Sequence, residues 1–342
     1  MIDHPASGTG RHNIFARTSQ LGLLVFTMWA TALVTMDGAT TRDEPGEMAT
    51  LLPANSNDSQ TTIEIRAHFK SREFAEVAHL SNALIQSHPR SWEGYFWKGA
   101  AAIQQREFYS AVRNLRAAEK REPPHNSVAK NLAIAYYLLD QQHLFEIKMK
   151  AAIALDPGDF APHYYLGRYY LSSTSFEVSV AAESFSRALE KKPDDAAATC
   201  FLGIALEALG QFDHARERFM RVVEGAGTQG LIAGLAYQGL SRLALAGDAG
   251  AALDFARKAI AADSKSAEAQ LQLAKSAAAT GDRNQQLAAL HAAASLARNE
   301  ARPQYQLVLL YRQMGDEAAA RSAVASYQRS VSCFGNEAPG DR

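Results

Sequence analysis

Ten histidines and two cysteines are the side chains that could serve as metal ligands or nucleophiles, and their spacing forms no recognised site. Cys200 and Cys333 lie outside any C-x-x-C pair, so they indicate neither a metal site nor a disulfide framework. The chain has no GxxxxGK[ST] phosphate loop and no HExxH motif. The histidines share no metal-ligand spacing, as at His143, His163, His214 and His291. We therefore predict that the protein is not an enzyme and has no metal site and no cofactor.

The composition favours helices as the elements that position these side chains. Of the 342 residues, 64 are alanine, which loses no side-chain entropy in a helix, whereas only 11 are proline. A hydrophobic fraction of 47% supplies enough apolar surface for a core and excludes a wholly disordered chain. The 35 basic and 36 acidic residues nearly cancel, which argues against nucleic acid as a partner.

The amino-terminal part of the chain has the pattern of an export segment. Two arginines precede the uncharged apolar run 21–36, and a positive flank before such a run is typical of a secretory signal. We predict that residues 1–38 are a signal peptide, with membrane attachment through an uncleaved anchor at 21–36 as the alternative. The expected location is exported: periplasmic, extracytoplasmic or membrane-anchored. The alternative role of the run is a buried helix of the solenoid, and the alternative location of the protein is cytoplasmic.

Two segments are predicted to lie outside the folded part. Residues 39–60 contain Pro45, Gly46 and Pro53 among polar side chains, which is the composition of a flexible linker. Residues 333–342 form a short C-terminal tail.

A repeat of 34 residues organises the rest of the chain. Pro89, Pro123 and Pro157 are separated by this interval. A second set of markers, Gly-Asp pairs, keeps the same period at Gly247, Gly281 and Gly315.

Between these markers, apolar residues follow the three- and four-residue spacing of one helix face. The segment 92–123 shows this spacing twice, with a break near Gln105 and Arg106, so each unit is predicted to be a pair of helices. Cys200 falls within such a helix and is expected to be a small apolar filler rather than a nucleophile. We predict an all-α fold in which residues 61–332 form a solenoid of about eight helical pairs.

These units resemble the tetratricopeptide repeat (TPR) family. The signature positions are matched by Leu202, Gly203, Gly210, Phe212, Ala215 and Phe219, and by the closing prolines of other units. The last three units depart from the pattern because they lack the closing proline, and the sixth, from about Leu231, carries extra residues. The resemblance implies a right-handed superhelical solenoid whose concave channel is lined by the first helix of each repeat.

The resemblance also implies which residues line the channel. Nine of them, aromatic or cationic, are the predicted partner-binding residues: Phe96, Lys130, Tyr137, Tyr164, Arg168, Tyr237, Lys275, Tyr305 and Arg312. Tyrosines supply large contact area at low entropy cost, and the cations suit acidic side chains or a terminal carboxylate. Packing against a neighbouring repeat is the alternative role for each of these residues.

We therefore predict an exported, non-enzymatic scaffold that binds a peptide segment or a partner protein in the channel. The alternative is an accessory subunit of a cell-envelope or secretion assembly that docks through its convex surface. Family members that hold a chaperone's carboxyl terminus use a clamp of Lys and Asn. Lys130 matches one clamp position, but Ile134 and Tyr165 stand where asparagines are required, so we reject that partner.

Overall fold

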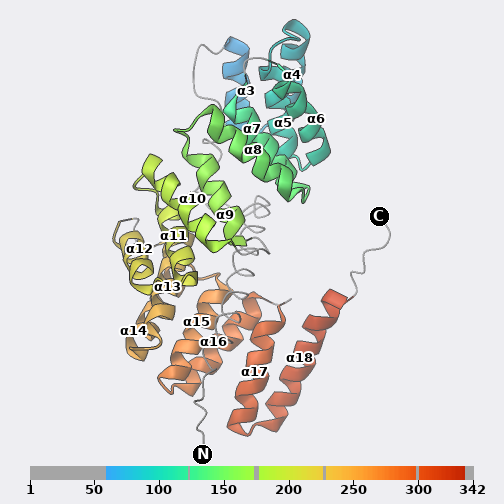
Figure 1. Ribbon diagram of the computed structural model, residues 1–342. Helices are drawn as coiled ribbons and strands as arrows, with labels where there is room; N and C mark the ends of the chain where they lie inside the picture. The colour runs from blue at the N-terminus through green and yellow to red at the C-terminus, as the bar shows by residue number, and fades with distance from the viewer. Residues whose placement is uncertain (1–58, 122–123, 173–176, 226–228, 298–299, 336–342) are drawn as a thin grey trace, which may run out of the picture. The chain divides into compact units, whose positions relative to one another are not determined.

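The computed structural model describes residues 59–121, 124–172, 177–225, 229–297 and 300–335 (Figure 1). The predicted export segment 1–38 and almost all of the predicted linker 39–60 lie outside these ranges. The chain divides into two compact units at Pro193 and Asp194, and each is described separately. Among the described residues the secondary structure consists of α-helices and turns without strands, which confirms the all-α prediction.

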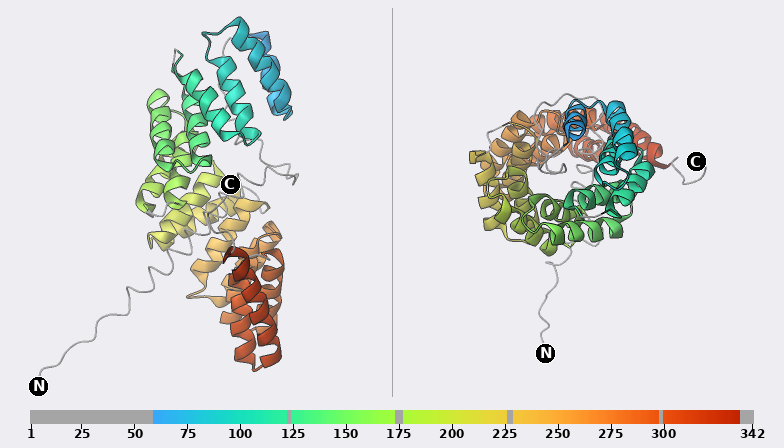
Figure 2. Two further views of the ribbon diagram at one scale, coloured as in Figure 1. Left: turned by 90° about the vertical axis from the view of Figure 1, so that its right-hand side faces the viewer. Right: turned by 90° about the horizontal axis from the view of Figure 1, so that it is seen from above.

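The described residues of unit 1 form four helical hairpins in which each helix packs against the next along the chain (Figures 1 and 2). The hairpins are α3 (Gln60–Lys70) with α4 (Phe74–Ser87), α5 (Glu93–Gln104) with α6 (Phe108–Glu119), α7 (Asn126–Leu138) with α8 (Gln142–Leu155), and α9 (Phe160–Ser172) with α10 (Val178–Lys191).

Four further hairpins of the same kind make up the part of unit 2 that the structure describes. They are α11 (Ala196–Ala208) with α12 (Phe212–Gly225), α13 (Leu231–Ala244) with α14 (Ala249–Ala262), α15 (Ala267–Ala279) with α16 (Arg283–Leu296), and α17 (Ala301–Met314) with α18 (Glu317–Gly335). The helix α18 runs three residues past 332, the predicted end of the solenoid. The prediction of about eight helical pairs is confirmed.

The turn within most hairpins is a Schellman motif. At the end of α15, the amide of Gly281 donates to the carbonyl of Ala278, and the amide of Asp282 donates to the carbonyl of Ala277. This closure needs a left-handed residue, and Gly281 has a φ of 78°. The same conformation occurs at the five corresponding turn residues Arg72, Arg106, Asp140, Gly210 and Gly315.

The Gly-Asp markers therefore have a physical basis. Glycine adopts the left-handed conformation without steric cost, and the aspartate that follows caps the next helix. Asp282 accepts a hydrogen bond from the amide of Gln285, and Asp316 accepts one from the amide of Ala319, both at 2.9 Å. The α13–α14 turn differs, because Gly247 is not in the left-handed region although Asp248 still caps α14.

The closing prolines stand directly after second helices, where they prevent the helix from continuing. Pro89, Pro157 and Pro193 follow α4, α8 and α10 closely. Pro123 lies outside the described residues.

Small residues in the first helices allow large side chains of the second helices to pack closely. The ring of Phe219, fully buried on α12, lies against Gly203 of α11 and Gly239 of α13. A Cβ atom added at Gly239 would lie 2.4 Å from this ring. Phe219 thus joins its own hairpin to the following one.

Further along unit 2, alanine replaces the aromatic side chains. Ala252, Ala256 and Ala259 are fully buried along one face of α14, and Ala293 is fully buried on α16. Leucines of the first helices complete this core, with Leu271 of α15 and Leu307 of α17 buried.

None of the helices in the described ranges has the length and apolar character needed to cross a membrane. The predicted membrane-attachment run, residues 21–36, is not among the residues searched.

Candidate functional site

The predicted partner-binding residues lie on first helices, in both units. In unit 1 they belong to α5, α7 and α9, and in unit 2 to α13, α15 and α17. Their surroundings decide which of them present a surface, so each is placed in turn.

Phe96 on α5 is fully buried. Its ring makes edge-to-face contacts with Trp92 and Trp97, with centroids 5.5 and 5.2 Å away. This packing explains why an aromatic side chain stands here. Partner contact by Phe96 stays a prediction, and the burial gives it no support.

Lys130 on α7 is 3% exposed and forms an ion pair with Asp159, at 2.5 Å between Nζ and Oδ2. Asn126 donates a hydrogen bond to the same oxygen at 3.0 Å. Asp159 immediately precedes α9, so this pair links two consecutive hairpins. The sequence signal for Asp159 was weak, because it lies 29 residues beyond Lys130 in a turn.

Tyr164 and Arg168 are one turn apart on α9 and are 5% and 6% exposed. The guanidinium carbon lies 5.6 Å from the centre of the Tyr164 ring, which is within range of a cation–π contact. Tyr164 also packs against Phe160, with ring centres 5.4 Å apart. The side chains of this pair therefore contact each other and the surrounding helices.

Tyr137, near the end of α7, is half-buried and packs edge-on against Phe145, with ring centres 5.5 Å apart. Burial raises the pKa of Tyr137 to about 12. Its hydroxyl is therefore a neutral hydrogen-bonding group throughout the physiological pH range.

In unit 2, an inter-repeat ion pair connects α11 and α13. Arg242 donates to both carboxylate oxygens of Glu207, at 2.8 and 2.7 Å. Burial lowers the pKa of Arg242, but the Glu207 carboxylate outweighs this and holds it above its usual value. Arg302 of α17 similarly pairs with Glu268 of α15. The two pairs lie on consecutive first helices of the unit.

Lys275 on α15 lies in the electrostatic field of these pairs. It makes no ion pair or side-chain hydrogen bond with another residue in the described part of the chain. Burial lowers its pKa, Glu268 raises it, and the cations Arg302 and Arg242 lower it further, for a net decrease. Lys275 is thus a partly desolvated cation without a carboxylate partner among the described residues.

The last first helix, α17, carries an exposed apolar stripe. Tyr305 is 49% exposed and Leu309 is 40% exposed, and they are one helical turn apart. Arg302 and Arg312 lie on the same side, three residues before and three residues after these two. We call Lys275, Arg302, Tyr305, Leu309 and Arg312 the α15–α17 face.

The remaining predicted residue of unit 2, Tyr237 on α13, is 7% exposed and stacks on Phe255 of α14 at 6.5 Å between ring centres. Cys200 on α11 is fully buried, as expected for an apolar filler, and burial raises its pKa to about 12. A thiol in this environment keeps its proton and is a poor nucleophile.

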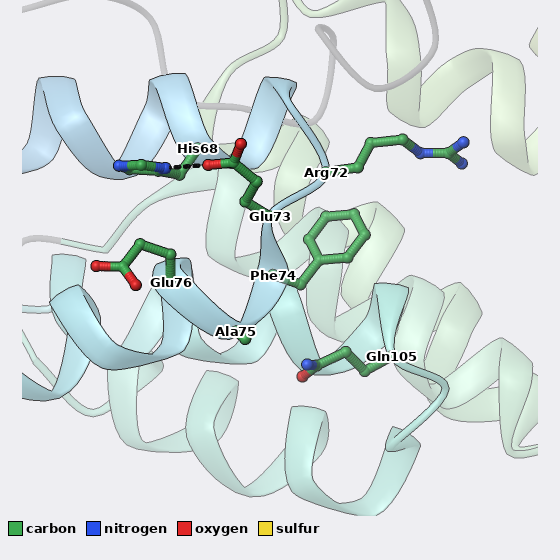
Figure 3. Close-up of a pocket in the computed structure, with 7 residues that line it drawn as sticks. All are labelled: His68, Arg72, Glu73, Phe74, Ala75, Glu76 and Gln105. Atoms are coloured by element: carbon green, nitrogen blue, oxygen red, sulfur yellow. Dashed lines mark hydrogen bonds and ion pairs between the residues drawn. The ribbon is translucent and has the colours of Figure 1, made fainter.

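A separate open depression lies in unit 1 beside the α3–α4 turn (Figure 3). The imidazole of His68 points to the carboxylate of Glu73 and is paired with it. Arg72 and Phe74 extend on the opposite side of the turn from His68. The described residues contain no group of three or more side chains arranged to hold a metal ion.

Sequence reasoning missed Leu309 and Arg242 as members of the first-helix surface. Leu309 could have been found from the spacing of Arg302, Tyr305 and Arg312, which leaves position 309 on the same side. Arg242 is not one of the nine predicted residues, and only the geometry shows that it reaches Glu207.

Comparison with known proteins gives structural likeness at low sequence identity. No protein-family model matches the chain, and no curated protein matches it. The C-terminal part of a TPR repeat-containing protein from Cytophaga hutchinsonii matches with a TM-score of 0.54 and 16% identity over 71% of this chain and 97% of that chain. A tetratricopeptide repeat protein from Parabacteroides merdae matches with a TM-score of 0.54 and 15% identity, over 74% and 99%.

A third similar structure is PilW, described as a widely conserved type IV pilus biogenesis factor. It matches with a TM-score of 0.52 and 18% identity, over 60% of this chain and 92% of that chain. Identities this low show the arrangement of helices and carry no residue roles from one protein to another.

Proposed function

We propose that this chain, which has the tetratricopeptide-repeat fold, is a non-enzymatic scaffold that binds a peptide segment or a partner protein through the first helices of its repeats. The observation that carries the proposal is the exposed stripe of Tyr305 and Leu309 on α17. The corresponding positions of the preceding repeat, Leu271 and Lys275, are buried and half-buried. The first-helix surface is therefore more exposed at α17 than at α15.

The stripe has the chemistry of a peptide contact. The ring of Tyr305 packs against Tyr327 of α18, with ring centres 5.8 Å apart, and about half of the residue stays exposed. Tyrosine combines a large apolar area with a hydroxyl that can bond to a peptide backbone, and it has few rotamers to order on binding. A peptide bound at micromolar affinity needs about −8 kcal/mol, which a few such anchors can largely supply.

A matched pair of tyrosine variants tests the proposal. A random 12-residue peptide library is selected on the full chain, and the binders are measured against Tyr305→Ala and Tyr109→Ala. Tyr109 is 79% exposed but lies on the second helix α6. Loss of binding in Tyr305→Ala alone supports the proposal. Binding that survives in Tyr305→Ala contradicts it.

A second candidate function is that of an accessory subunit of a cell-envelope or secretion assembly, docking through the outer, second-helix surface. Large apolar side chains are exposed on these helices, with Tyr109 at 79%, Ile147 at 43% and Leu155 at 45%. The likeness to a pilus biogenesis factor supports this alternative. Partner binding that is lost in Tyr109→Ala and kept in Tyr305→Ala would favour it.

Export completes the proposal and rests on the sequence of residues 1–38. Their positive flank and apolar run direct the chain out of the cytoplasm, either as a cleaved signal or as a retained anchor. Mass determination of the mature protein together with membrane fractionation distinguishes the two. An intact chain that stays in the cytoplasmic fraction would contradict export.

A further inference from the structure

The cations on the first helices of unit 2 differ in whether a carboxylate is paired with them. On α11 and α13, Arg242 is fully matched by Glu207 in a two-bond pair. The helices α15 and α17 carry three cations, Lys275, Arg302 and Arg312, and one carboxylate, Glu268, which is paired with Arg302. Within these two helices alone the excess is two positive charges, whereas the whole chain has a formal net charge of −1.

Among these cations, Lys275 is the best suited to bind an anionic group of a ligand. Its side chain is half-buried and makes no ion pair with another described residue. Lowering of its pKa by burial shows that the fold holds this cation at an energetic cost. A bound carboxylate would remove that cost, because an opposite charge in a partly desolvated site stabilises the ammonium.

The apolar stripe of Tyr305 and Leu309 lies one repeat after Lys275, at equivalent positions of the first helix. Lys275 and Leu309 are 34 residues apart, which is one repeat interval, and Tyr305 precedes Leu309 by one helical turn. The ion pair of Arg302 with Glu268 joins α17 to α15, and Lys275 lies two helical turns after Glu268 on the same side of α15. Cations therefore flank an exposed aromatic and an exposed aliphatic side chain.

We propose that the α15–α17 face binds an acidic peptide segment, with a carboxylate at Lys275 and an adjacent apolar side chain against Tyr305 and Leu309. Arg312 is exposed and receives a second carboxylate at the far end of the stripe. This inference rests on the proposed function and specifies its ligand: a peptide that is rich in aspartate or glutamate and that carries aromatic or aliphatic residues between them.

The test uses the full chain and the peptides selected on it from the random 12-residue library. Binders are expected to be enriched in Asp and Glu beside apolar residues. Lys275→Met, which keeps the length of the side chain and removes the charge, is expected to weaken Kd about tenfold to hundredfold, the range for one charged hydrogen bond. The control is Lys258→Met on α14, which removes an exposed lysine outside the face and is expected to leave Kd unchanged.

A second measurement keeps the test valid if the protein variant folds poorly. Each Glu of the selected peptide is replaced in turn by Gln and measured on the unaltered protein. The Gln replacement that contacts Lys275 is expected to cause a similar loss, and the two changes combined are expected to cost little more than either one. High salt should weaken binding of the acidic peptide and spare its Gln version.

The outcomes separate this inference from the proposed function. Binders that require Tyr305 but show no acidic enrichment and no loss in Lys275→Met would overturn the acidic-peptide inference and leave the peptide-binding function standing. A library that yields no binders, or only binders unaffected by Tyr305→Ala, would overturn both.

Discussion

Three glycines mark the same place in the repeat, yet the structure predicts opposite responses to alanine. Gly281 and Gly315 have φ values of 78° and 75°, whereas Gly247 is outside the left-handed region. A Cβ atom added at any of the three meets no atom within 4 Å. Replacement by alanine therefore tests the backbone conformation alone, without a steric contribution from packing.

The expected change follows from two opposing effects. An L-residue in the left-handed conformation costs about 1–2 kcal/mol. Alanine also restricts the unfolded chain, which stabilises the folded state by about 0.4–1 kcal/mol. Gly281→Ala and Gly315→Ala are therefore expected to lower the free energy of unfolding by about 0.5–1 kcal/mol. Gly247→Ala has only the second effect and is expected to be neutral or slightly stabilising.

The assay is urea denaturation of each full-length variant, followed by circular dichroism at 222 nm. The shift of the midpoint is compared between variants at constant slope, because the slope reports the surface exposed on unfolding. The reasoning is refuted if Gly247→Ala loses as much stability as Gly281→Ala. It is also refuted if neither Gly281→Ala nor Gly315→Ala loses stability.

Three further changes have expected outcomes. Gly239→Ala should lower the free energy of unfolding by about 1–3 kcal/mol, because its methyl carbon would lie 2.4 Å from the Phe219 ring; adding Phe219→Leu should recover part of the loss in the same urea assay. Lys275→Met should stabilise the protein at pH 7, because the pKa of Lys275 is lowered in the folded state. As pH rises toward 10.5, the pKa of Lys275 in the unfolded chain, the folded protein loses the proton of Lys275 first, so the stability gained by Lys275→Met should shrink. Urea midpoints at pH 7, 9 and 10.5 would show whether it does. The pKa of Tyr137 is raised from 10.0 to about 12, so its contribution to stability, full below pH 10, should be lost between pH 10 and 12; Tyr137→Phe should show a smaller alkaline loss, and an equal loss would contradict the assigned pKa.

The repeat could be predicted from the sequence because its markers act locally. Asp282 caps the helix that begins at the next residue, and Gly281 closes the helix that has just ended, so both roles are visible within a few residues. The prediction failed to separate Gly247 from Gly281, because the α13–α14 turn closes with a different bond: the amide of Asp248 donates to Ala244, four residues back.

The surroundings of the first-helix residues could not be predicted in the same way. Lys130 matched a family position, but whether it was available depended on Asp159, which belongs to the start of the next hairpin. Phe96 and Tyr237 were placed on the correct helices, yet neighbouring aromatic rings and helices cover them. Tyr305 and Arg312 were predicted from the same positions and are exposed. Position in the repeat fixes the side of the helix, whereas exposure depends on which side chains pack around it, from neighbours on the same helix at Phe96 to the next hairpin at Lys130.

The junctions between hairpins of unit 2 differ in what fills them. Phe219 lies against glycines of two successive hairpins, whereas the buried face of α14 is made of alanine methyl groups. Alanine has no rotamers to order, and it removes far less apolar surface from water than phenylalanine does. If the ends of the molecule are pulled apart, the junction at α14, where alanines pack against leucines of α15, should yield at a lower force than the one held by Phe219. Unit 2 would then lengthen under tension in a fixed order, beginning where the side chains are smallest.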